Sequence, residues 1–161
     1  MRGFEVVSRF ENADIMLPKR STKHSAGYDF YAPEDITIPS HVNLWSSRLF
    51  HTQNVVKPFC IKTGVKAYMG EDEVLQLYMR SSNPGKLGLV CSNSVGIIDS
   101  DYYNNEENEG EIGFLVYNLS ARPIRISKGQ KLGQGIFTTY LLTDNDDSDG
   151  ERTGGYGSTG K

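Results

Sequence analysis

The sequence predicts an all-β domain, built as a sandwich or a barrel. Short runs in which apolar and polar residues alternate follow one another closely along the chain, and such period-two alternation is typical of half-buried strands. No stretch of helical length carries an amphipathic pattern, so we expect at most a short helical turn around residues 83–88. Proline and glycine stand at the expected corners between runs, at Pro39, Pro58, Gly64, Gly110 and Gly129.

Each run assigns its apolar residues to one face of a strand, because side chains at positions i and i+2 point to the same side. Val42 and Leu44 alternate with polar neighbours in the first run. The later runs place three further sets on shared faces. These are Leu75, Leu77 and Met79; then Ile112, Phe114 and Val116; then Ile124 and Ile126. A last run, KLGQGIFTTYLL, puts Leu132, Gln134 and Ile136 on a common face.

Length and composition limit the class of protein. A chain of 161 residues is expected to form one domain with a single core. The net charge of −3 gives no general attraction to nucleic acid. There is no apolar run of membrane-spanning length and no signal-peptide pattern at the N-terminus, so we expect a cytoplasmic protein without a membrane partner. Cys60 and Cys91 lack metal-binding spacing and are expected to be reduced core residues.

The chain changes character near its end. Residues 144–151 (DNDDSDGE) are acidic and lack an apolar anchor, so we expect a mobile linker between a β-domain at 1–143 and a glycine-rich tail at 152–161. Gly155, Gly160 and Lys161 nearly satisfy a nucleotide-binding phosphate loop. That loop needs a helix after it, and the sequence stops at Lys161, so we expect the tail to hold phosphate in another way.

Five short stretches place polar or strained residues where a β-domain would otherwise pack apolar ones. They are 26–32 (AGYDFYA), 80–83 (RSSN), 93–102 (NSVGIIDSDY), 129–134 (GQKLGQ) and 152–160 (RTGGYGSTG). In this order they resemble the five motifs of the trimeric deoxyuridine triphosphatase (dUTPase) family, over essentially the whole chain. The resemblance implies a jelly-roll-like β-barrel, a homotrimer with shared active sites, and a C-terminal motif supplied by a neighbouring subunit.

The resemblance also implies an activity. Members hydrolyse dUTP to dUMP and pyrophosphate with Mg²⁺, which keeps uracil out of DNA and supplies dUMP for thymidylate synthesis. Asp99 would orient and deprotonate the attacking water, although an Asx turn that caps the strand end is an alternative reading. Gln134 would hold the water and a phosphate oxygen, since an amide both donates and accepts. Its neighbours Gly133 and Gly135 replace the usual alanine and leucine and suggest a looser strand.

Three sites along the chain would hold the triphosphate and its metal. Asp29 matches the family's first-motif aspartate, which binds Mg²⁺ through water; a polar cap between two aromatic residues is the alternative. Arg80 and Ser81 match the second motif and would donate to phosphate oxygens. Ser82, also assigned to substrate binding, replaces a common glycine there.

The nucleoside pocket is expected in the third motif. The hairpin that contains Gly96 and Ile98 would offer backbone groups to the edge of uracil, and Asn93 would add an amide. Tyr102 would lie against the deoxyribose and exclude a ribose hydroxyl; the alternative is a core aromatic residue.

The tail would close the site. Its glycines, Gly157 among them, would let backbone N–H groups curl around an anion. Arg152 adds charge, Ser158 and Thr159 add hydroxyl donors, and Tyr156 would stack on the base. The spacing from Arg152 to Tyr156 is one residue shorter than in the family. A tail without a role is the alternative.

Two features leave other functions open. Residues 104–109 (NNEENE) interrupt the third-motif region relative to the family; they are most simply a hairpin tip in water, and otherwise a partner-binding loop or a cation site. The same barrel also occurs in dCTP deaminases, which carry a catalytic glutamate where this chain has Leu115. A dUTPase-like module with a regulatory protein partner is the remaining alternative.

Overall fold

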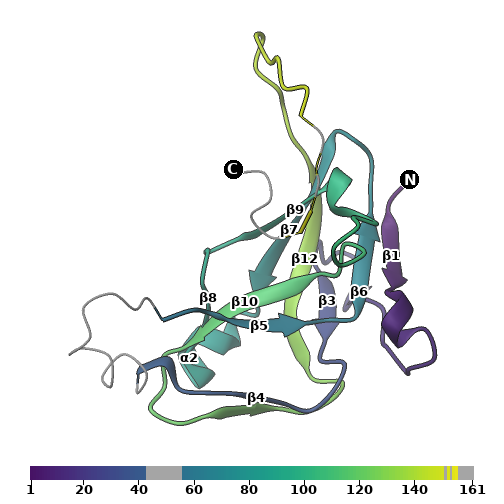
Figure 1. Cartoon of the computed structure of the whole chain (residues 1–161). Helices are drawn as coiled ribbons and strands as arrows, with labels where there is room; N and C mark the ends of the chain where they lie inside the picture. The colour runs from purple at the N-terminus through teal and green to yellow at the C-terminus, as the bar shows by residue number, and fades with distance from the viewer. Residues whose placement is uncertain (43–55, 151, 153, 156–161) are drawn as a thin grey trace.

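Antiparallel strands make up most of the regular structure in the computed structural model, which describes residues 1–42, 56–150, 152 and 154–155 (Figure 1). The strands are β1 (Gly3–Val6), β2 (Lys19–Arg20), β3 (Tyr28–Tyr31), β4 (Ile36–Ile38), β5 (Phe59–Lys62), β6 (Val65–Tyr68), β7 (Glu73–Met79), β8 (Leu89–Cys91), β9 (Gly96–Asp99), β10 (Gly113–Asn118), β11 (Ile124–Ile126) and β12 (Lys131–Thr139). Short helical segments are η1 (Ser8–Phe10), α2 (Ser82–Leu87) and η2 (Ser100–Tyr102). The all-β prediction is confirmed, and α2 is the helical turn expected there.

The strands form one large sheet and several smaller ones. The large sheet has the order β2-β3-β12-β7-β9, and a second sheet has the order β5-β10-β8. Strands β1 and β6 pair with each other, as do β4 and β11. Figure 1 shows β10 and β5 running across β7 and β12, and the rings of Phe30 and Phe114 meet at a centroid distance of 5.6 Å. The arrangement is jelly-roll-like, with the core between these layers.

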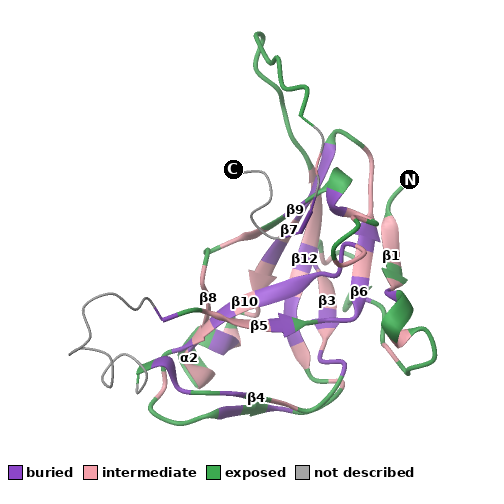
Figure 2. Cartoon of the chain, viewed as in Figure 1, coloured by how far each residue is buried: buried purple, intermediate pink, exposed green. Residues whose placement is uncertain are grey.

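The predicted strand faces are largely the faces that form this core. Leu75 and Leu77 on β7 are 0% and 2% exposed, and Phe114 and Val116 on β10 are 1% and 0% exposed. Figure 2 shows the buried residues concentrated along the strands where these layers meet. Ile112, Ile124 and Ile126 are also buried, and Met79 packs against the cluster from its edge.

Strand β12 departs from the predicted pattern. Its pairing with β3 shifts register between Lys131 and Gly133, so Leu132 is buried in the core while Gln134 and Ile136 are only half-buried. A Cβ at Gly133 would lie 2.5 Å from both the Phe114 ring and the Tyr78 carbonyl oxygen. The predicted common face of Leu132, Gln134 and Ile136 is therefore wrong. So is the looser strand, because glycine is needed here for close packing.

The strand predicted at Val42 and Leu44 is not found in the described residues. His41 and Val42 have helical backbone, so Val42 does not belong to a strand, and Leu44 lies outside the described residues.

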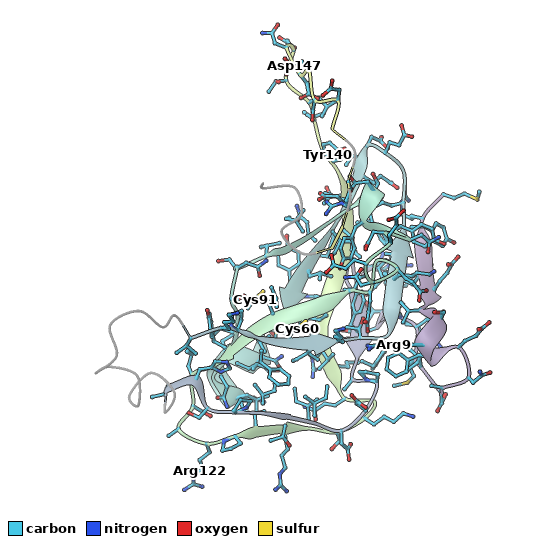
Figure 3. The ribbon with its side chains drawn as sticks, viewed as in Figure 1. Arg9, Cys60, Cys91, Arg122, Tyr140 and Asp147 are labelled. Atoms are coloured by element: carbon cyan, nitrogen blue, oxygen red, sulfur yellow. The ribbon has the colours of Figure 1, made fainter. Side chains whose placement is uncertain are left out.

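Residues 144–150 are exposed throughout and project from the end of β12, with Tyr140 near the base and Asp147 near the tip (Figure 3). Across the described part of the chain, every helix is too short or too polar to cross a membrane.

Candidate active site

The first, second and fourth motifs meet on the large sheet. Asp29 on β3 lies directly opposite Gln134 on β12, and Gln134 lies opposite Tyr78 on β7. Arg80 follows one residue after β7 ends. Antiparallel pairing fixes these neighbours, because directly opposed residues point to the same face. We refer to Asp29, Gln134 and Arg80, with the adjoining Ser81 and Ser82, as the sheet cluster.

The carboxylate of Asp29 is held by two donors. Lys131 Nζ lies 2.6 Å from Asp29 Oδ2, and the Ser21 hydroxyl donates to the same oxygen at 2.5 Å. Burial by itself would raise the pKa of Asp29. The hydrogen bonds from Lys131 and Ser21, together with the positive charges of Lys131 and Arg80, outweigh burial and lower this pKa below its ordinary value. Asp29 is therefore an ionised acceptor at neutral pH.

Glycine and asparagine position the other members of the sheet cluster. A Cβ at Gly27 would lie 2.1 Å from Gln134 Oε1, so the side chain of Gln134 rests directly on this glycine of the first motif. Asn83, which is 5% exposed, donates from Nδ2 to the Leu132 carbonyl at 2.8 Å. Its backbone N–H bonds the Arg80 carbonyl at 2.9 Å. Asn83 thus ties the Arg80–Ser82 turn to β12.

The hairpin of the third motif borders a small pocket. Asn93, Gly96 and Ile98 line it, together with Cys91 and Leu115. The Cys91 thiol donates to Asn93 Oδ1 at 2.9 Å. A Cβ at Gly96 would lie 3.1 Å from the Leu77 Cβ, so glycine lets the hairpin lie close against β7. Cys60 and Cys91 are both unpaired thiols and are half-buried rather than fully buried (Figure 3).

Asp99 stands at the end of β9, beside the tail. Its side chain is 52% exposed and accepts from Arg152 Nη2 at 2.6 Å. Asp101 accepts from Arg152 Nε at 2.7 Å. Asp99 makes no side-chain capping hydrogen bond to the short helix that follows it, which argues against the Asx-turn alternative. We refer to Asp99, Asp101, Tyr102 and Arg152 as the hairpin cluster.

Tyr102 is a core residue in the single chain. It is 4% exposed, its hydroxyl donates to the Glu111 carbonyl at 3.1 Å, and it accepts from Asn108 Nδ2 at 2.9 Å. The guanidinium carbon of Arg152 lies 5.6 Å from the centre of its ring. The core alternative therefore describes its packing, while a deoxyribose contact stays a prediction.

The two clusters lie far apart within one chain. Asp99 is opposite Val74 on β7, four residues from Tyr78, which is about 13 Å along the strand. Strands β9 and β12 flank β7 on opposite sides, which adds about 10 Å across the sheet. A base must lie within hydrogen-bonding reach of the water it deprotonates. A single chain therefore does not bring Asp99 to a phosphate held by the sheet cluster.

The inserted residues 104–109 are integrated into the fold, so a hairpin tip in water describes them only in part. Asn105 Nδ2 donates to the Tyr102 carbonyl at 2.8 Å, and the Glu109 carboxylate accepts from the Ser8 backbone at 3.1 Å. Glu107 Oε2 accepts from the Gly155 N–H at 2.6 Å. The insertion thus contacts both ends of the described chain.

The sequence does not identify some of the residues that contact the site. Lys131 and Asp101 belong to the fourth and third motifs, but only the pairing of strands and the position of the tail reveal their partners. Ser21 lies outside the five motifs, and Asn83 carries no signal beyond its place as the last residue of the second motif. The predicted tail residues Tyr156, Gly157, Ser158 and Thr159 lie outside the described residues.

Comparisons with known proteins agree with these motifs. The dUTPase family model matches residues 13–160. The deoxyuridine 5'-triphosphate nucleotidohydrolase of Lactococcus lactis subsp. lactis (strain IL1403) is 47% identical, covering 99% of this chain and 98% of that protein.

Solved structures give the same result for the fold. A crystal structure of dUTPase from Streptococcus mutans has a TM-score of 0.73 at 40% identity, covering 88% of this chain and 98% of that one. A mutant dUTPase from phage phi11 of S. aureus, described with a structural Mg(II) ion, has a TM-score of 0.63 at 21% identity, covering 93% and 97%. The latter likeness is one of fold alone.

Proposed function

Since the chain belongs to the dUTPase family, we propose that it hydrolyses dUTP to dUMP and pyrophosphate. The observation that carries this proposal is the small pocket of the third-motif hairpin, lined by Asn93, Gly96 and Ile98 and followed directly by Asp99. A pyrimidine recognised there would leave its α-phosphate near a carboxylate base. The activity would keep uracil out of DNA and supply dUMP for thymidylate synthesis.

In the proposed reaction, Asp99 accepts a proton from the attacking water. A bond forms between the water oxygen and the α-phosphorus, the bond to the bridging oxygen breaks, and pyrophosphate leaves. Gln134 orients the water through its amide, while Arg80, Ser81 and Ser82 donate to phosphate oxygens. Tyr102 bounds the deoxyribose. In the tail, Arg152, Gly157, Ser158 and Thr159 would bind phosphate oxygens, and Tyr156 would stack on the base.

Asp29 is proposed to contact Mg²⁺ through water. The described residues contain no cluster of three or more carboxylates, histidines or cysteines able to hold a metal. A single ionised carboxylate suits a cation that keeps most of its waters, and the lowered pKa of Asp29 supports that state. When bound, Mg²⁺ would offset the negative charge of the triphosphate.

We further propose that the complete site forms between copies of this chain, in a homotrimer. The distance between the sheet cluster and the hairpin cluster supports this, because the base and the phosphate ligands must meet around one nucleotide. A sheet cluster would then face the hairpin of a second subunit. Sedimentation velocity tests the assembly: a trimer is expected, and a fully active monomer would contradict shared sites.

Deamination of dCTP is less well supported. Leu115 stands where the deaminases carry their glutamate, and it lines the same pocket. An aliphatic side chain cannot transfer a proton. A pocket closed by Leu115 therefore suits recognition of a base and not its conversion.

A screen of nucleoside triphosphates with and without Mg²⁺ tests the activity. We expect pyrophosphate from dUTP in the presence of Mg²⁺, with dTTP, UTP and dCTP cleaved at least about 100-fold more slowly. Equal cleavage of these four nucleotides, or release of ammonia from dCTP, would overturn the proposal.

A further inference from the structure

Residues at the start of the tail contact carboxylates of their own chain. Arg152 contacts Asp99 and Asp101 at 2.6 and 2.7 Å, and the Gly155 N–H contacts Glu107 at 2.6 Å. Two separate segments supply these acceptors, the third-motif hairpin and the 104–109 insertion. The family resemblance assigns no role to that insertion.

We propose that Asp99, Asp101 and Glu107 form an acidic docking surface that holds Arg152 and Gly155, at the start of the chain's own tail. In this state Arg152 covers the carboxylate that the proposed function assigns as the base, so that nucleotide binding must first displace a resident arginine. The docking itself does not depend on that function.

The geometry around Arg152 fits a specific contact. Its side chain is 9% exposed, while the carboxylates of Asp99 and Asp101 are 52% and 53% exposed. The guanidinium donates from two different nitrogens to two different carboxylates. Arginine is suited to such pairing because its planar guanidinium presents several N–H donors. The Tyr102 ring at 5.6 Å adds a cation–π contact.

The contact at Gly155 leaves little space for a side chain. A Cβ there would lie 2.9 Å from both Asn108 Nδ2 and Glu107 Oε2. Asn108 has little room to move, because its Oδ1 accepts from Asn105 at 2.8 Å and its Nδ2 donates to the Tyr102 hydroxyl. The insertion is therefore shaped to receive the tail backbone at close range.

Limited trypsin digestion of the nucleotide-free enzyme tests the docking. Cleavage after Arg152 requires its side chain to leave the acidic surface, so the rate reports the undocked population. We expect Glu107→Gln and Asp101→Asn each to accelerate loss of the tail about three- to tenfold, measured by intact mass spectrometry. Glu106→Gln is the matched control, because Glu106 is an exposed neighbour in the same loop, and it should cleave at the wild-type rate. Equal rates for Glu106→Gln and Glu107→Gln would overturn the proposal.

A mixed assembly tests whether the tail docks on its own chain. Wild-type chains and Glu107→Gln chains are co-expressed, distinguished by the mass of an N-terminal tag. We expect only the tails of Glu107→Gln chains to be cleaved faster, whatever chains surround them. Faster cleavage of wild-type tails in proportion to the variant would show docking on a neighbour and refute the assignment. The results of both digests test the docking whether or not the protein hydrolyses dUTP.

Discussion

The sheet cluster and the hairpin cluster differ in what holds their side chains. Asp29 and Gln134 are opposed in a strand ladder, and Lys131 fixes the carboxylate of Asp29. Asp99 stands at a strand end, half-exposed, and its partner Arg152 comes from the tail. The comparison separates a surface that strand pairing fixes from a half-exposed carboxylate, the proposed base, whose ion-pair partner comes from the tail.

The largest expected effect separates chemistry from binding in the hairpin cluster. Asp99→Asn removes the proposed proton acceptor but keeps the size and polarity of the side chain. Turnover of dUTP should fall by roughly 10²- to 10⁴-fold, while a non-hydrolysable dUTP analogue still binds. Steady-state kinetics and calorimetry measure the two effects. Near-normal turnover would show that Asp99 is not the proton acceptor. The hairpin cluster would then differ from the sheet cluster in its contacts alone and not in its chemistry.

The rigidity of the sheet cluster can be tested at Gly133. A Cβ there meets the Phe114 ring and the Tyr78 carbonyl at 2.5 Å, and relief requires the strands to separate. Gly133→Ala should lower the free energy of unfolding by about 1–3 kcal/mol, measured by urea denaturation. Gly150→Ala is the control, since a Cβ at Gly150 meets nothing within 4 Å, and it should stay within about 0.5 kcal/mol of wild type. A stable Gly133→Ala protein would mean that β12 tolerates displacement.

The same strand shows how far the sequence predicts the structure. Alternation correctly identified the buried faces of β7 and β10, because those strands are regular and packed on one side. It failed at Leu132, where a register shift moves a residue into the core without any change in composition. Gly133 and Gly135 suggest a looser strand in the sequence, since a glycine needed for close packing cannot be told there from a flexible one.

The candidate site was predictable to the extent that motifs mark it. Asp29, Gln134 and Asp99 stand in recognisable stretches, yet their spatial division depends on strand order, which no local pattern encodes. The contact between Glu107 and Gly155 joins segments 48 residues apart. An acidic loop in sequence is indistinguishable from a solvated tip until the segment that it contacts is placed.

A smaller effect is expected from the ion pair that orders the sheet cluster. The folded pKa of Asp29 lies below its ordinary value, so its pairing stabilises the fold above the unfolded pKa of about 3.9. That stability is lost as the pH falls through the folded value. Lys131→Met should therefore cost about 1 kcal/mol at pH 7, and the difference from wild type should shrink below about pH 4. Lys128→Met, at an exposed lysine, is the control. A pH-independent difference would show that Lys131 acts through packing.

The smallest expected effect concerns the pocket of the hairpin. The Cys91 thiol donates to Asn93 Oδ1, which leaves the Asn93 amide nitrogen available to the nucleobase. Cys91→Ala should raise KM for dUTP about two- to fivefold without changing kcat, since one weak hydrogen bond positions the amide. Cys91→Ser restores a donor and should recover most of the affinity. The proposed pocket would recognise the nucleobase before chemistry begins. A loss confined to kcat in both variants would therefore mean that this hairpin affects Asp99, the proposed proton acceptor, and not recognition of the pyrimidine.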